Sequence, residues 1–322
     1  MRAGRSRVWL AGLAGVGALL AAALATGGSP PGPYLIALGT VQDGGLPHAG
    51  CRCERCEAAR RDPRLARRVA SLAVVLPASR KVYLVDATPD VERQLAALAP
   101  LRQAPAGRVD RQPVDGVLLT HAHIGHYLGL AHFGFEVLNT RGLPVWATPR
   151  MARFLSDNGP WDQLVRLGNV ELRPVEPGGT IELGDGVRAT SLAVPHRDEY
   201  SDTVAYLFRG PRRSLLYVPD TDSWARWQRP LPEVLAGVDV ALVDGTFYSP
   251  EELPGREVTK IGHPLITETM GLLGEAVRAG RLRVVFTHLN HSNPGLDAHS
   301  AARRALEGRG FAVLAEGDEF EL

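Results

Sequence analysis

Three histidines stand within six residues at the end of a short apolar run, and this feature constrains the chain more than any other. Residues 117–119 follow an Asp-Gly turn and predict a buried strand that delivers His121, His123 and His126 to its carboxyl end. Residues two apart in an extended segment point the same way, so His121 and His123 can bind one ion. His126 comes where we expect the chain to turn into a helix, and it faces a neighbouring point. Surface or core histidines are the alternative, but three in six residues favour a metal site.

Later segments repeat the pattern of a strand that ends at a metal-binding side chain. The side chains that follow predicted strands in this way are His196, Asp220, Asp244 and His288. Asp220 could bridge two ions because each of its oxygens can bind one, whereas His196 could instead be an exposed loop histidine. Asp86 ends a predicted strand at 81–85 and either orients the site or caps the next helix. We expect the loop at 248–262 to lie over the site.

All three cysteines of the chain lie in one segment, Cys51, Cys53 and Cys56. Their odd number leaves no complete disulfide framework, and the spacing brings the thiols too close for ordinary disulfide geometry. Three soft ligands in six residues suit a closed tetrahedral zinc site whose fourth ligand, a histidine, comes from elsewhere. A redox-active thiol group in an oxidising compartment is the alternative. The pattern then predicts a helix over 57–69.

The composition is that of an ordinary globular protein. The 322 residues are 45% hydrophobic and 22% charged, with a formal net charge of +1. The composition has no basic excess that would indicate a nucleic-acid partner. The partner we expect is a small-molecule substrate. The sequence does not determine the oligomeric state.

The first 28 residues differ from the rest. Arginines at 2, 5 and 7 precede an uncharged run from 8 to 28 that ends near a small-residue cleavage site at 23–25. This pattern predicts a secretory signal peptide; an uncleaved N-terminal anchor, the only membrane contact we expect, is the alternative. Either way the domain would be periplasmic or secreted. Residues 29–33 form a Pro-rich spacer, and the folded domain is expected over 34–322.

The order of these strand-end residues along alternating strands and helices resembles the metallo-β-lactamase fold. The resemblance covers 34–322 and implies an α/β protein, a four-layer αββα sandwich with metal ions at one edge. A narrower resemblance is to the branch that contains pyrroloquinoline-quinone biosynthesis protein B and the phosphonate-pathway cyclic phosphodiesterases. The motifs that carry it are the cysteine cluster, Gly39-Thr40, Val194-Pro195-His196, Ser201-Asp202-Thr203, Asp244-Gly245-Thr246-Phe247 and Thr287-His288.

This resemblance implies a role for each position. The active-site metal ligands would be His121, His123 and His196 for the first ion, His126 and His288 for the second, and Asp220 as the bridge. The structural zinc would be held by Cys51, Cys53, Cys56 and His291. His263, in the loop before the last strand, would act as general acid or phosphate contact, so that His263 and Asp220 are the candidate catalytic residues.

One position departs from the family pattern. The usual turn is His-x-His-x-Asp-His, but this chain has Gly125 in place of the aspartate. The substitution removes a second-site ligand and an acid/base group, which leaves His126, His288 and Asp220 for the second ion. We therefore expect a filled first site and a weaker or optional second one, and we expect Gly125→Asp to raise the metal content.

The pattern as a whole predicts a metal-dependent hydrolase that cleaves an ester or phosphodiester with a metal-activated water. Zinc is the expected metal, and manganese or iron could also occupy the active site. Carboxylates such as Asp86 and Asp244 would orient ligand imidazoles. Two alternatives remain open: a biosynthesis protein B-like, iron-dependent oxygenase in a cofactor pathway, and a non-catalytic metal-dependent binder of a small molecule.

Overall fold

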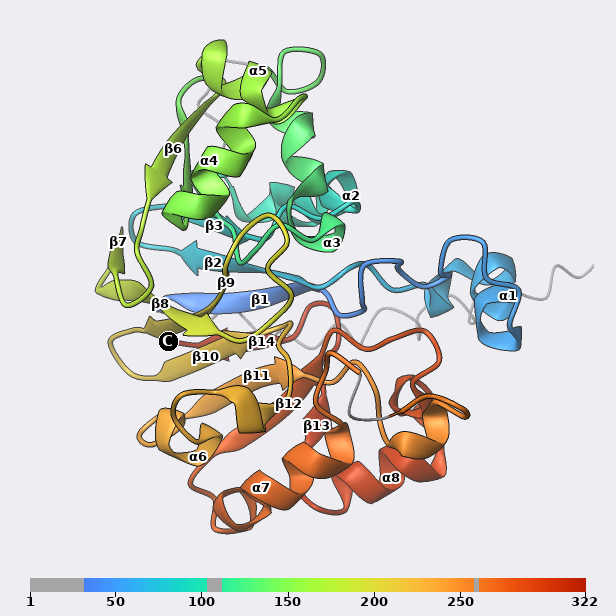
Figure 1. Ribbon diagram of the computed structural model, residues 1–322. Helices are drawn as coiled ribbons and strands as arrows, with labels where there is room; N and C mark the ends of the chain where they lie inside the picture. Colours follow the sequence, from blue (N-terminus) through green and yellow to red (C-terminus); the bar gives the residue numbers. More distant parts are fainter. Residues whose placement is uncertain (1–31, 103–111, 258–260) are drawn as a thin grey trace, which may run out of the picture. The chain divides into compact units, whose positions relative to one another are not determined.

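Two seven-stranded sheets lie face to face in the computed structural model, which describes residues 32–102, 112–257 and 261–322 (Figure 1). The first sheet has the order β14-β1-β2-β3-β4-β5-β6 and the second β13-β12-β11-β10-β9-β8-β7. The strands of the first sheet are β1 (Tyr34–Gly39), β2 (Ser71–Leu76), β3 (Lys81–Val85), β4 (Gly116–Leu118), β5 (Leu143–Ala147), β6 (Val170–Pro174) and β14 (Glu319–Glu321). Those of the second are β7 (Thr180–Gly184), β8 (Val187–Val194), β9 (Thr203–Arg209), β10 (Ser214–Val218), β11 (Val240–Asp244), β12 (Arg283–Thr287) and β13 (Ala312–Val313).

Helices cover the outer face of each sheet. The α-helices of the described chain are α1 (Glu54–Arg61), α2 (Val91–Leu98), α3 (Ile124–Tyr127), α4 (Pro149–Asp157), α5 (Trp161–Arg166), α6 (Leu231–Val234), α7 (Ile266–Arg278) and α8 (Ala301–Glu307). Of these, α1 lies beside the sandwich and packs in a separate small cluster with Val41 and Leu46 (Figure 1). Apolar side chains of α2, α4 and α5 pack on the first sheet, and those of α6, α7 and α8 pack on the second. The predicted four-layer αββα sandwich is thereby confirmed.

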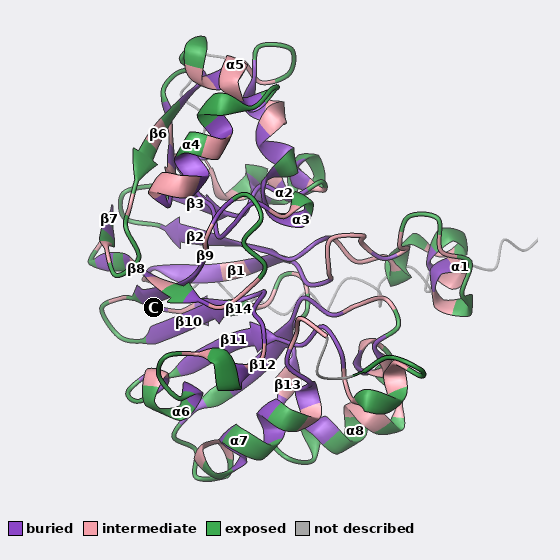
Figure 2. Cartoon of the chain, viewed as in Figure 1, coloured by how far each residue is buried: buried purple, intermediate pink, exposed green. Residues whose placement is uncertain are grey.

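The central strands are apolar on both faces because both faces are covered. In β10, Leu215 and Tyr217 point between the sheets, while Leu216 and Val218 point to the helices. Every residue of β2, β10 and β11 is buried (Figure 2). Such continuous apolar runs are typical of strands that are buried on both faces.

Strand direction decides where the polar residues gather. Neighbours from β3 to β6 are parallel, as are those from β10 to β13. β1 and β8 are each two antiparallel steps away from a strand of these sets, so they run in the same direction. The carboxyl ends of β1, β3, β4, β8, β10, β11 and β12 therefore lie at one edge of the sandwich.

The helix predicted over 57–69 is wrong in its bounds. α1 ends at Arg61, because Asp62 leaves the helical region before Pro63 starts a separate 3-10 turn.

The predicted signal peptide or anchor at 1–28 lies outside the described residues, as does most of the spacer. No helix of the described chain is long and apolar enough to cross a bilayer.

Candidate metal centre

Four side chains from three strand ends surround one point at this edge. The ligand atoms of His121, His123, His196 and Asp220 all lie within 4.8 Å of one another. Asp220 Oδ2 lies 3.3 Å from Nε2 of His121 and 3.1 Å from Nε2 of His196. Ligands held tetrahedrally at about 2.0–2.1 Å from zinc lie about 3.3 Å apart. The spacing of this cluster thus fits one tetrahedral ion.

A second cluster lies beside the first and contains a residue that sequence reasoning missed. Asp43, His126 and His288 bring their ligand atoms together, with Asp43 Oδ1 at 3.6 Å from Nε2 of each histidine. Asp220 Oδ2 is 3.8 Å from Nε2 of His126 and 3.9 Å from that of His288. A single carboxylate oxygen therefore faces both clusters.

Unpaired buried atoms show that these residues fit a metal. In the described part of the chain, the buried atoms that have no hydrogen-bond partner include five at these two clusters: Asp43 Oδ1, His121 Nε2, His126 Nε2, Asp220 Oδ1 and His288 Nε2. An unsatisfied buried polar atom costs about 1–3 kcal/mol. Five of them around two neighbouring points would be a large destabilisation, which bound cations would remove.

The other ring nitrogen of the ligand histidines is held by a neighbour. Asp86 Oδ2 lies 2.8 Å from His126 Nδ1, and Thr246 Oγ1 lies 3.0 Å from His288 Nδ1. Thr120 Oγ1 is 2.9 Å from Nδ1 of His121. These contacts leave Nε2 of each ring free for an ion, as in known metal sites. Asp86 does not cap a helix, since the N-cap of α2 is Asp90.

Charge around the clusters raises some histidine pKa values and lowers others. Burial lowers the pKa of His126, but the carboxylates of Asp86, Asp43 and Asp220 outweigh it and raise the pKa to about 9. Burial and the neighbouring His126 hold the pKa of His121 well below its usual value. A metal ion takes the place of the proton on a ligand imidazole. The carboxylates that raise the pKa of His126 therefore also favour the binding of a cation.

His263 stands at the mouth of the site. Its Nδ1 lies 2.9 Å from Asp244 Oδ2 and 3.3 Å from Asp220 Oδ1. Burial lowers the pKa of His263, yet Asp244 and Asp220 raise it to about 9. Asp244 therefore holds His263, although the sequence predicted that it would orient a metal-ligating imidazole. His263 could also join a ligand group with Asp220, Asp244 and His288.

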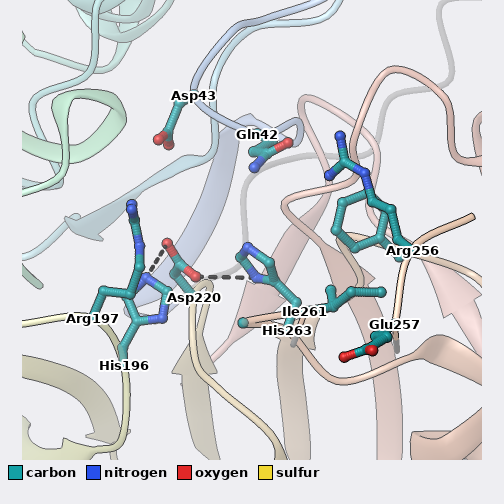
Figure 3. Close-up of a pocket in the computed structure, with 11 residues that line it drawn as sticks. Gln42, Asp43, His196, Arg197, Asp220, Arg256, Glu257, Ile261 and His263 are labelled. Carbon is teal, nitrogen blue, oxygen red and sulfur yellow. Dashed lines mark ion pairs between the residues drawn. The ribbon is translucent and has the colours of Figure 1, made fainter. Parts of the chain in front are cut away.

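A pocket of about 480 Å³ opens beside these clusters (Figure 3). In Figure 3, Asp43, Asp220, His196 and His263 face it, and Arg197 and Arg256 lie at its sides. The remaining lining residues are Gln42, Phe247, Glu257, Ile261 and Gly262. The loop predicted to lie over the site supplies the residues from 256 onwards, although 258–260 lie outside the description.

The cysteine cluster forms a separate site. Cys51, Cys53, Cys56 and His291 bring one ligand atom each within 4.8 Å of the others. The cysteines form no disulfide, and the backbone N–H groups of His48 and Cys53 donate to Sγ of Cys56 and Cys51 at 3.3 and 3.4 Å. All four residues predicted for the structural zinc thus lie together.

The space beside Gly125 is occupied, although the sequence pattern indicated a site that lacks a ligand there. A Cβ at this position would lie 2.0 Å from Oδ1 of Asp43 and 2.9 Å from its Cα. The place of the missing side chain is thus filled by Asp43. We therefore no longer expect Gly125→Asp to raise the metal content, because its side chain would collide with Asp43. Asp43 lies four residues beyond the carboxyl end of β1, at the same sheet edge, and this position after a strand is its sequence signal.

Comparison with known proteins agrees with this architecture. Residues 81–289 match the family described as the beta-lactamase superfamily domain. The chain therefore belongs to the β-lactamase superfamily. Within it, coenzyme PQQ synthesis protein B of Methylobacterium sp. (strain 4-46) is a relative, 31% identical over 301 residues, with 88% of this chain and 97% of the relative covered. The narrower resemblance drawn from the sequence is thus confirmed.

Solved structures give the same result. Zn²⁺-bound PqqB from Methylobacterium extorquens has a TM-score of 0.76 and 26% identity, covering 90% of this chain and 100% of that one. A diphosphatase from the PhnP family has a TM-score of 0.64 and 22% identity, covering 90% and 97% of the two chains. The second likeness supports the fold.

Proposed function

We propose that the protein is a zinc-dependent hydrolase with a two-metal centre that cleaves an ester or phosphodiester bond. The observation that carries the proposal is the position of Asp220 Oδ2, which faces both ligand clusters at 3.1 to 3.9 Å. Sites with two metals that share a carboxylate are typical of hydrolases. The first ion would be held by His121, His123, His196 and Asp220. The second would be held by His126, His288 and Asp220.

When bound, zinc supplies a water of lowered pKa as nucleophile and stabilises the negative charge that develops on the substrate. The protein's own residues position the substrate and move the proton. Asp244 fixes Nδ1 of His263, so the opposite ring nitrogen is available to donate a proton to the leaving oxygen. Arg197 and Arg256, on the pocket wall, would bind an anionic part of the substrate.

The experiment is a substrate panel tested with protein loaded with zinc or manganese. We expect turnover of at least one of the phosphodiesters, carboxylic esters or lactones in the panel, and loss of that turnover in His196→Ala. The exposed His299 is the matched control, because His299→Ala removes an imidazole outside both clusters. Tight zinc binding without turnover of any ester would contradict the proposal and favour a binder.

Likeness to coenzyme PQQ synthesis protein B favours a second candidate function, a step in making a cofactor. The corresponding chemistry would be iron-dependent oxygenation rather than hydrolysis. Protein purified with iron would then consume oxygen in the presence of its substrate. The same zinc-loaded preparation would be inert on the ester panel, which separates the two candidates.

The remaining proposals concern location and the structural metal. Residues 1–28 would carry the domain to the periplasm or the exterior, and the cysteine cluster would hold a zinc ion that stabilises the fold. Mass spectrometry of the recovered chain tests the first proposal. A chain cleaved after 23–25 supports a signal peptide, an intact one in the membrane fraction supports an anchor, and recovery from the cytosol contradicts both.

A further inference from the structure

The geometry points to Asp43 as the carboxylate ligand of the second metal, supplied from the loop after β1 in place of the aspartate that related proteins carry at position 125. This inference rests on the proposed two-metal centre. On this inference Gly125 does not mark a lost ligand. Its missing side chain leaves the space that Asp43 occupies.

The first argument is the direction of the Asp43 carboxylate. Its Oδ1 is buried, lies 3.6 Å from Nε2 of both His126 and His288, and has no hydrogen-bond partner among the described residues. The two imidazole nitrogens that it faces have no hydrogen-bond partner either. Three buried ligand atoms that converge at distances longer than a hydrogen bond leave room for an ion between them.

The second argument is that the backbone fixes the Asp43 loop against His288. The N–H of Gln42 donates to the carbonyl of Leu289 at 3.1 Å, and the N–H of Leu289 donates to that of Thr40 at 3.1 Å. Val41 and Leu289 form a parallel bridge. His288 itself has a left-handed backbone, with φ of 60°. The two ligands are thus placed by one set of backbone hydrogen bonds.

The third argument is that positions 43 and 125 compete for the same space. A Cβ at 125 would lie 2.0 Å from Oδ1, 2.6 Å from Cγ and 2.9 Å from Cα of Asp43. The contacts with Oδ1 and Cγ exclude an aspartate at 125 as long as the Asp43 side chain keeps its position. When the side chain at 43 is removed, only the contact with Cα is left, and a small backbone shift, which a glycine at 43 permits, relieves it. The chain can therefore place a carboxylate ligand at 43 or at 125, but not at both.

The test is a swap of the carboxylate, read as metal bound per chain. Four forms of the full chain are compared: wild type, Asp43→Gly, Gly125→Asp, and the double variant with both changes. Each is loaded with zinc, dialysed and analysed by elemental mass spectrometry. Cobalt loading gives a second readout, since its absorption depends on ligand number. Asp43→Asn, which keeps the shape of the side chain, serves if Asp43→Gly unfolds.

We expect Asp43→Gly and Asp43→Asn to lose about one zinc per chain while the first site and the cysteine site stay filled. Gly125→Asp alone should lose metal and thermal stability, whereas the double variant should regain the lost ion. Asp198→Asn is the matched control, because it removes an exposed carboxylate of the neighbouring loop and should keep the wild-type count.

Two results would overturn the inference. One is a wild-type zinc count in both Asp43 variants; the other is a double variant that binds no more zinc than Asp43→Gly. The count of bound metal does not depend on turnover. If the ester panel gives no activity and the swap still restores the ion, the hydrolase proposal fails while the assignment of Asp43 stands.

Discussion

The carboxylate of Asp86 lies 2.8 Å from Nδ1 of His126, and both side chains are fully buried. Asp86 also accepts hydrogen bonds from the backbone N–H and the hydroxyl of Thr120. It stands in the left-handed region, with φ of 65°, where a residue other than glycine is strained. This contact fixes the ring so that Nε2 of His126 faces the second cluster.

Replacing Asp86 should therefore weaken metal binding without removing a ligand. We expect Asp86→Asn to lower zinc affinity at the second site by about 10–100-fold, because the asparagine is neutral and a poorer partner for a ligand imidazole. Competition with a coloured chelator measures this. Unchanged affinity in a variant with wild-type circular dichroism would show that Asp86 does not orient His126.

His263 should act in proton transfer rather than in metal binding. We expect His263→Ala to lower kcat by about 10²–10⁴-fold on esters with poor leaving groups, and much less on p-nitrophenyl esters, whose leaving group needs no proton. Its zinc count should equal that of the wild type. A lost zinc would instead make His263 a ligand, together with Asp244 and His288.

The cysteine cluster should stabilise the fold. Arg55 of α1 donates to the backbone carbonyls of His291 and Asn293 at 2.7 and 2.8 Å, so this site connects α1 to the segment after His288. We expect Cys56→Ser to lose about one zinc and to lower Tm on the order of 5–10 °C. If the wild-type protein is isolated without zinc at this cluster and its thiols react with a thiol reagent, the redox alternative is favoured.

Arg256 should contribute to the choice of substrate. It lines the pocket from the exposed loop that leads to His263. We expect Arg256→Ala to raise KM for anionic phosphodiesters by about two- to fivefold, the range of an exposed ion pair, with little effect on kcat. Neutral esters provide the control within one preparation. An equal rise in KM for both substrate classes would mean that the arginine acts through loop conformation.

Much of this site could be predicted because strand ends are readable in a sequence. His121, His123 and His288 each follow an apolar run, and parallel strands bring such ends to one edge. The grouping of His291 with the cysteines came from family resemblance, since no local pattern connects residues so far apart.

What could not be predicted depends on contacts between distant loops. Asp43 lies four residues beyond the end of β1, and only the pairing of its loop with Leu289 brings it to His288. The sequence pattern indicates a lost ligand at Gly125 for the same reason, because the side chain that fills its place belongs to Asp43, 82 positions earlier in the chain. The pairing of Asp244 with His263 likewise depends on a loop whose path no periodicity defines.

The central claim is that two metal ions share Asp220. The most direct measurement is an anomalous difference map at the zinc edge from crystals of the zinc-loaded protein. We expect two peaks about 3.5–4 Å apart with Asp220 between them, and a separate peak at the cysteine cluster. A single peak at the histidine clusters, bound by His121, His123 and His196 with the second cluster empty, would contradict the account.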